Sequence, residues 1–156
     1  PSYSVEKIGE LLRENAFQAQ VTLEDQVPQG LKVHFDKDGL YQVVFNLMEN
    51  AIKYNRPGGK VTIQAQKQEN GELVHLQIQD TGIGMAPEEL PHIFERFYRV
   101  DKARSRERGG TGLGLAIVSD WLQVLGGKIQ VESVLGQGTT FTVTLPAARP
   151  PEEDSL

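Results

Sequence analysis

The spacing of apolar residues changes period several times along this 156-residue chain, and the order of these changes limits how it can fold. Apolar residues recur at helical spacing in residues 5–18, 38–54 and 113–125. They alternate with polar residues, as in half-buried strands, in residues 20–23, 31–35, 61–66, 73–79, 128–132 and 139–145. A shorter helix is expected near residues 87–94, before an irregular charged stretch that extends to Gly110. This order predicts an α+β fold, a two-layer sandwich with helices on one face of a mixed, mostly antiparallel sheet.

The composition is that of a single soluble domain. We expect one domain over residues 1–146 and a disordered acidic tail over residues 147–156, where proline and acidic residues gather. The chain contains no cysteine, which excludes disulfides and thiolate metal sites. Its longest apolar runs are too short to cross a bilayer.

The charge distribution favours a small anionic ligand over nucleic acid. The net charge of −5 argues against non-specific nucleic-acid binding, which depends on a basic surface. Within residues 96–108, however, basic residues outnumber acidic ones: Arg96, Arg99, Lys102, Arg104, Arg106 and Arg108 stand against Asp101 and Glu107.

Three polar residues share one face of the predicted helix over residues 38–54. Asn46, Asn50 and Lys53 are spaced i, i+4 and i+7. They can form an ordinary solvated face, but asparagine is a poor helix former because its side chain competes for the backbone. An amide oxygen is a hard ligand suited to Mg²⁺, which is usually shared with substrate phosphates. Lys53 would supply a positive charge to those phosphates.

Two glycine-containing segments complete the candidate site. In Asp80-Thr81-Gly82-Ile83-Gly84-Met85 a predicted strand ends in an aspartate, and the glycines allow a turn beside a flat ligand. An aspartate-initiated turn without a ligand is the alternative, whereas a carboxylate at the floor of an apolar pocket suits an exocyclic amine such as that of adenine.

The second segment, Gly109-Gly110-Thr111-Gly112-Leu113-Gly114-Leu115, leads directly into a helix. Backbone N–H groups at such a helix start bind anions, since they lack partners and the helix dipole is positive there. A flexible hinge is the alternative. The spacing matches neither a dinucleotide-binding fingerprint nor a Walker loop.

In this order, and together with Phe94-Glu95-Arg96-Phe97-Tyr98-Arg99, these segments resemble the N, G1, F and G2 boxes of bacterial sensor histidine kinases. The resemblance to their catalytic and ATP-binding domain extends from about Val5 to Leu145. It implies the Bergerat (GHKL) fold, Mg²⁺ and ATP as ligands, and transfer of the γ-phosphoryl group to a histidine in a two-component regulatory system.

The resemblance also implies roles for individual residues. Asn50 would hold Mg²⁺, Asp80 would accept the adenine amino group, and Glu49 is a hypothetical polariser of the nucleophile, although an ordinary solvated glutamate is as good a reading. Phe94 and Phe97 would pack at the base of a mobile lid. The other implied contacts to the nucleotide come from Asn46, Lys53, Tyr54, Gly82, Gly84, Arg99, Lys102, Arg104, Gly110, Thr111, Gly112, Leu113, Gly114 and Thr140, of which Lys53 and Arg99 are also catalytic candidates.

The phosphate acceptor is expected outside the chain. None of His34, His75 and His92 is followed by the family's acceptor pattern. The resemblance therefore implies a catalytic domain of a longer kinase, monomeric when isolated and on the cytoplasmic side of a membrane-bound sensor. Its partners would be a histidine-containing dimerisation domain and a response regulator.

Three alternatives stay open. One is a serine kinase that acts on an anti-anti-sigma partner, although residues 94–101 favour a sensor kinase. Another is an ATP-driven clamp like gyrase, which carries a catalytic glutamate where this chain has Asn46. The third is a module that senses nucleotide without transfer.

Overall fold

The computed structural model describes residues 5–27, 37–68, 73–98 and 113–146. The elements follow one another as α1 (Val5–Gln18), β1 (Thr22–Gln26), α2 (Lys37–Lys53), β2 (Lys60–Gln68), β3 (Leu73–Asp80), the 3₁₀ helix η1 (Pro87–His92), α4 (Gly114–Leu125), β4 (Lys128–Val134) and β5 (Gly138–Pro146). Among these residues no helix is both long and apolar enough to span a membrane.

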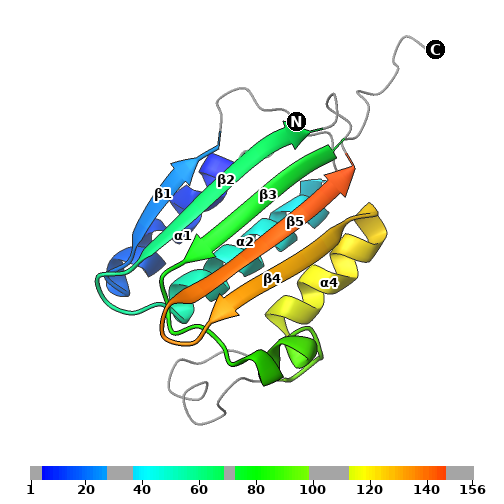
Figure 1. Cartoon of the computed structure of the whole chain (residues 1–156). Coiled ribbons are helices and arrows are strands. Elements are labelled where there is room, and N and C mark those ends of the chain that lie inside the picture. Colours follow the sequence, from blue (N-terminus) through cyan, green and yellow to red (C-terminus); the bar gives the residue numbers. More distant parts are fainter. Residues whose placement is uncertain (1–4, 28–36, 69–72, 99–112, 147–156) are drawn as a thin grey trace, which may run out of the picture.

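The strands form one sheet in the order β1-β2-β3-β5-β4. β1 pairs parallel with β2, and every other pair is antiparallel. In Figure 1 helices α1, α2 and α4 all lie on the same face of this sheet. The predicted α+β sandwich is therefore confirmed.

The core lies between the sheet and α2. Alternate residues of β3 and β5 face the helices and are buried: Val74, Leu76, Ile78, Phe141, Val143 and Leu145. They meet the apolar side of α2, where Val43, Val44 and Leu47 have no exposed surface. The opposite face of the sheet is polar, with contacts such as Gln77 Nε2 to Thr142 Oγ1 at 3.3 Å. Successive side chains along each strand thus point to opposite faces of the sheet, and only those on the helix face can reach the candidate site.

The predicted element boundaries agree with the structure to within a few residues. α4 ends where expected, because Gly126 adopts a left-handed conformation (φ 74°) and its N–H reaches back to the carbonyls of Leu122 and Gln123. The short helix is a 3₁₀ turn that ends at His92, two residues before the predicted end, with Pro91 inside it. The predicted strand over residues 31–35, the connection between residues 69 and 72, and the tail over residues 147–156 lie outside the described residues.

Candidate functional site

The polar face of α2 begins at Asn46, whose amide is oriented by its own helix. Asn46 Nδ2 donates to the Gln42 carbonyl at 2.7 Å and to Gln42 Oε1 at 3.2 Å. The amide oxygen is turned toward α4: a Cβ built on Gly114, the first residue of that helix, would lie 3.3 Å from Asn46 Oδ1. The structure therefore brings the asparagine segment of α2 against the start of α4, as the two motifs require if they share one ligand.

Asn50 lies one turn further along α2, half-buried, with Glu49 beside it and Lys53 and Tyr54 at the helix end. Within the described residues the Asn50 side chain makes no hydrogen bond, so its amide oxygen is available to a ligand. Hard amide oxygens suit Mg²⁺, which keeps waters and shares phosphate ligands. No group of three His, Asp or Glu side chains that could hold a metal occurs in the described residues. Asn50 and its surroundings fit Mg²⁺ brought in with a phosphate-bearing ligand.

Asp80, the last residue of β3, carries the buried carboxyl of the site. It is 8% exposed and points to the helix side of the sheet. Its Oδ1 accepts the backbone N–H of Gly82 at 2.8 Å and that of Thr139 at 3.3 Å. Burial raises the pKa of Asp80 to about 6, and the two backbone hydrogen bonds offset only part of that rise.

The second carboxylate oxygen of Asp80, Oδ2, indicates how the carboxyl can meet a ligand. Oδ2 makes no hydrogen bond within the described residues. Every fully buried side-chain nitrogen or oxygen there has a partner, so Oδ2 must reach accessible space. Backbone N–H groups hold the carboxylate through Oδ1, so Oδ2 can accept a hydrogen bond from a ligand group that carries N–H or O–H.

The glycines after Asp80 are required by close backbone packing. A Cβ on Gly82 would collide with the carbonyl oxygen of Tyr54 at the end of α2. Gly84 has φ 68° and a Cβ there would collide with the carbonyl oxygen of Val134. Residues 80–85, which we call the Asp80 loop, are therefore pressed between α2 and the β4–β5 turn.

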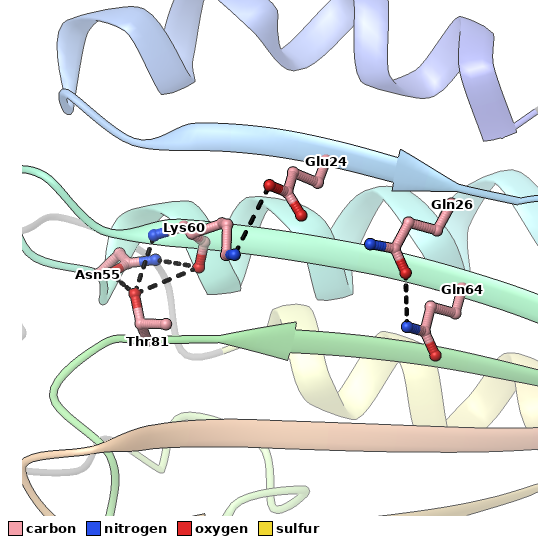
Figure 2. A network of polar contacts seen from close by, with 6 residues as sticks. All are labelled: Glu24, Gln26, Asn55, Lys60, Gln64 and Thr81. Carbon is pink, nitrogen blue, oxygen red and sulfur yellow. Dashed lines mark hydrogen bonds and ion pairs between the residues drawn. The ribbon is translucent and has the colours of Figure 1, made fainter.

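Hydrogen bonds fix the Asp80 loop to the end of α2. The Ile83 N–H donates to the Tyr54 carbonyl at 3.1 Å. Figure 2 shows how Asn55, Lys60 and Thr81 join the same region: Asn55 Nδ2 donates to the Lys60 carbonyl at 3.1 Å, and the Lys60 N–H donates to Thr81 Oγ1 at 2.8 Å. These hydrogen bonds connect the Asp80 loop to the end of the helix that carries Asn46 and Asn50.

The structure places Thr139, and not the predicted Thr140, beside the Asp80 carboxyl. Thr140 lies on the far face of β5, away from the helices, because buried positions alternate along this strand. Thr139 is paired with Asp80 in the sheet register, is buried, and donates its N–H to the Asp80 carboxyl. Its hydroxyl lies 2.8 Å from that of Ser133, which accepts the Met85 N–H at 2.8 Å. The parity set by the apolar residues Phe141, Val143 and Leu145 is the sequence signal that identifies Thr139.

Of the two phenylalanines expected to pack in residues 94–98, only Phe94 does so. Phe94 packs edge-on against Phe141, with ring centroids 6.4 Å apart. The expectation that Phe97 packs in the same way is wrong: its side chain is 70% exposed and its φ is 66°. Arg96 pairs with Asp120 of α4 at 2.9 Å, a contact that connects this segment to α4.

The remaining predicted site residues divide into two groups. Leu113 and Gly114 are described and form the start of α4. The others lie outside the described residues: Arg99, Lys102, Arg104, Gly110, Thr111 and Gly112.

The histidines are placed as follows. His75 lies half-buried in β3, on the face away from the helices. His92 Nδ1 lies 2.8 Å from Glu95 Oε2, and its ring stacks on Tyr98. His34 lies outside the described residues.

Comparison with known proteins places this arrangement in a family. Sensor histidine kinase WalK of Bacillus subtilis (strain 168) is 46% identical over 124 residues, which are 80% of this chain but only 20% of that protein. The structure of the mycobacterial sensor histidine kinase MprB superposes with a TM-score of 0.78 at 32% identity and covers 93% of this chain and 96% of that one. Full-length ShkA in complex with AMPPNP has a TM-score of 0.78 at 31% identity and covers 94% of this chain and 30% of that one.

Residues 35–149 match the family described as histidine kinase-, DNA gyrase B- and HSP90-like ATPases. This range contains both the asparagine face of α2 and the Asp80 loop, the two parts that the hydrogen bonds join. The match to the family and the likeness to MprB agree on the same fold. The chain belongs to the family of histidine kinase-, DNA gyrase B- and HSP90-like ATPases.

Proposed function

We propose that this chain is the catalytic domain of a two-component sensor histidine kinase, which binds Mg²⁺-ATP and passes the γ-phosphoryl group to a histidine on a separate dimerisation domain. The observation that carries the proposal is the buried Asp80, with one oxygen held by backbone N–H groups and the other available to a ligand. The relatives named as sensor histidine kinases, and ShkA in complex with AMPPNP, support it.

At the base end of the site, Asp80 Oδ2 would accept a hydrogen from the adenine amino group. The hydrogen bonds from Gly82 and Thr139 to Oδ1 hold the carboxyl in that orientation before the nucleotide arrives. A guanine or hypoxanthine base would place a carbonyl oxygen against this carboxylate, an unfavourable contact between two acceptors. Adenine specificity therefore follows from the chemistry of one side chain.

At the phosphate end, Asn46, Asn50 and Lys53 would face the triphosphate from α2, while the glycine-rich segment around Gly110, Gly112 and Gly114 would approach it from the start of α4. Mg²⁺, held in part by Asn50, would neutralise charge on the triphosphate and favour phosphoryl transfer. The basic residues Arg99, Lys102 and Arg104 would add positive charge. The residues of this chain would hold the γ-phosphoryl group in line with the acceptor imidazole.

The acceptor and the response regulator would be separate partners. The match spans only a fifth of the length of WalK, and we place the dimerisation domain in a part of the parent protein outside this chain. We propose that the parent is a membrane-bound sensor with this domain on its cytoplasmic side. Glu49, next to Asn50, would polarise the attacking imidazole.

Phosphotransfer in trans tests this function. The chain is mixed with γ-labelled ATP, Mg²⁺ and the dimerisation domain of its parent protein, and label is measured on each polypeptide. We expect label on the dimerisation domain alone, and the Glu49→Gln variant should slow transfer at unchanged ATP affinity. Label on His34, His75 or His92 of this chain contradicts the proposal, and full activity in Glu49→Gln removes the role of Glu49.

A further inference from the structure

Arg56 bridges two turns that are far apart in the sequence. It follows the end of α2, and its Nη2 donates to the Gly82 carbonyl at 2.8 Å and to the Gly136 carbonyl at 2.6 Å. The first carbonyl belongs to the Asp80 loop and the second to the β4–β5 turn. A terminal guanidinium nitrogen carries two N–H groups in one plane, so a single nitrogen can serve both oxygens.

The backbone of Arg56 is itself held in place. Its N–H donates to Asn55 Oδ1 at 2.9 Å, and its carbonyl accepts the Gly59 N–H at 2.9 Å. Asn55 is buried and also donates to the Lys60 carbonyl. The backbone of Arg56 is therefore held in place. The two hydrogen bonds of its guanidinium then hold both turns at a set position relative to that backbone.

The two turns also touch each other directly, next to the hydrogen bonds of Arg56. An open surface pocket of about 390 Å³ adjoins the contact and is lined by Arg56, by Thr81 of the Asp80 loop, by Gly136 and Gln137 of the β4–β5 turn, and by Gly59 before β2. A Cβ on Gly136 would meet nothing within 4 Å. The Gly136 N–H donates to the Ile83 carbonyl at 2.7 Å, and Gly84 packs closely against Val134 and Leu135.

Both turns adjoin the groups that orient the Asp80 carboxyl. Gly82, whose carbonyl Arg56 holds, donates its N–H to Asp80 Oδ1. The β4–β5 turn leads directly into Thr139, the second donor to the same oxygen. Any change in the separation of the turns would therefore move both groups that orient the Asp80 carboxyl, while leaving Asn46 and Asn50 of α2 in place.

We propose that Arg56 is a positioning residue for base recognition: by clamping the Asp80 loop to the β4–β5 turn, it sets the geometry in which Asp80 accepts the adenine amino group. This inference rests on the proposed nucleotide site. It concerns the base end alone, so the loss of Arg56 should alter discrimination between bases and leave the binding of phosphate groups unchanged.

Three probes separate the two ends of the site. ATP presents the amino group, inosine triphosphate replaces it with a carbonyl, and tripolyphosphate with Mg²⁺ has no base. Their affinities are measured by calorimetry for the wild type, Arg56→Ala and Arg56→Lys, with Arg13→Ala as the control that removes an exposed arginine from α1. Urea unfolding establishes that each variant is folded.

We expect Arg56→Ala to lower the ratio of ATP to inosine triphosphate affinity roughly tenfold, as for the loss of oriented hydrogen bonds. Arg56→Lys keeps the charge without the planar pair of donors and should also lower the ratio, to a smaller degree. Tripolyphosphate affinity and the Arg13→Ala variant should match the wild type.

A wild-type ratio in both Arg56 variants overturns the inference, as does an equal loss for all three probes. If Arg56→Ala does not fold, the ratio in Arg56→Lys decides. Failure of the wild type to bind ATP is a distinct result, which overturns the proposed nucleotide site itself.

Discussion

Asp80 is ionised at neutral pH at a cost to the stability of the fold. Its pKa is raised from 3.8 to about 6 by burial, so the folded protein binds this proton more tightly than the unfolded chain does. Its contribution to stability is therefore fully present below pH 3.8 and is lost as pH rises through 6. The shift corresponds to about 3 kcal/mol as an order of magnitude. A carboxyl kept in such a place needs a reason beyond the fold, and the proposed adenine contact supplies one.

This cost predicts that Asp80→Asn stabilises the folded protein at neutral pH. The amide keeps an oxygen for the N–H groups of Gly82 and Thr139 but carries no charge to bury. We expect its free energy of unfolding at pH 7.5 to exceed that of the wild type by about 1–3 kcal/mol. Urea unfolding between pH 4 and pH 8 measures the difference, which should shrink as pH falls. A difference independent of pH contradicts the account of the Asp80 carboxyl.

Thr139 and Thr140 form a matched pair for a second prediction at this scale. Thr139→Val removes the hydroxyl that meets Ser133 in a buried position, so we expect a loss of about 1–2 kcal/mol in the free energy of unfolding and weaker nucleotide binding. Thr140→Val alters the far face of the sheet and should stay within about 0.5 kcal/mol with unchanged binding. Chemical denaturation and nucleotide titration of both variants check this. Stronger effects in Thr140→Val would reverse the assignment.

At the scale of elements, α2 combines packing on one side with a polar face that weakens it as a helix. Its apolar side is buried against the sheet, whereas Asn46 and Asn50 are residues of low helix propensity. Asn46 recovers part of that loss through its hydrogen bonds to Gln42, and the Asn50 side chain has none within the described residues.

The Asn50→Ala variant should therefore separate stability from ligand binding. Alanine is the better helix former, so the free energy of unfolding should stay equal or rise by about 0.5 kcal/mol. The enhancement of ATP affinity by Mg²⁺, measured by titration with the metal and with a chelator, should largely disappear. Gln123→Ala, an exposed change on α4, should leave that enhancement intact. An unchanged Mg²⁺ dependence in Asn50→Ala would favour a module that senses nucleotide without transfer.

The elements themselves could be predicted from the sequence because periodicity reports directly on burial. The apolar side of α2 and the alternation in β3 and β5 correspond to the buried faces in the structure. The predicted Thr140 lies on the far face of β5, whereas the alternation from Phe141 to Leu145 indicates that Thr139 faces the helices. The exposure of Phe97 could not be predicted from periodicity, because residues in a short irregular segment do not alternate regularly between buried and exposed positions.

At the scale of the whole molecule, the site is made where segments distant in sequence meet. The proximity of Asn46 to the start of α4 and the hydrogen bonds of Arg56 to Gly82 and Gly136 depend on how the helices pack on the sheet. The order of the motifs indicates that these segments share a ligand. Their spacing does not predict that Arg56 bonds to Gly82 and Gly136, which lie 26 and 80 residues further along the chain. Such contacts require the assembled sheet and helices.

Calorimetric titration with Mg²⁺-ATP tests the central claim most directly, since the account depends on one site that accepts adenine through Asp80. The wild type should show saturable binding of one nucleotide per chain. Asp80→Asn, although folded, should bind roughly 10- to 100-fold more weakly, because it presents an amide N–H group or loses the charged acceptor. Absence of saturable heat in the folded wild type, or equal ATP affinity in Asp80→Asn, would contradict the account.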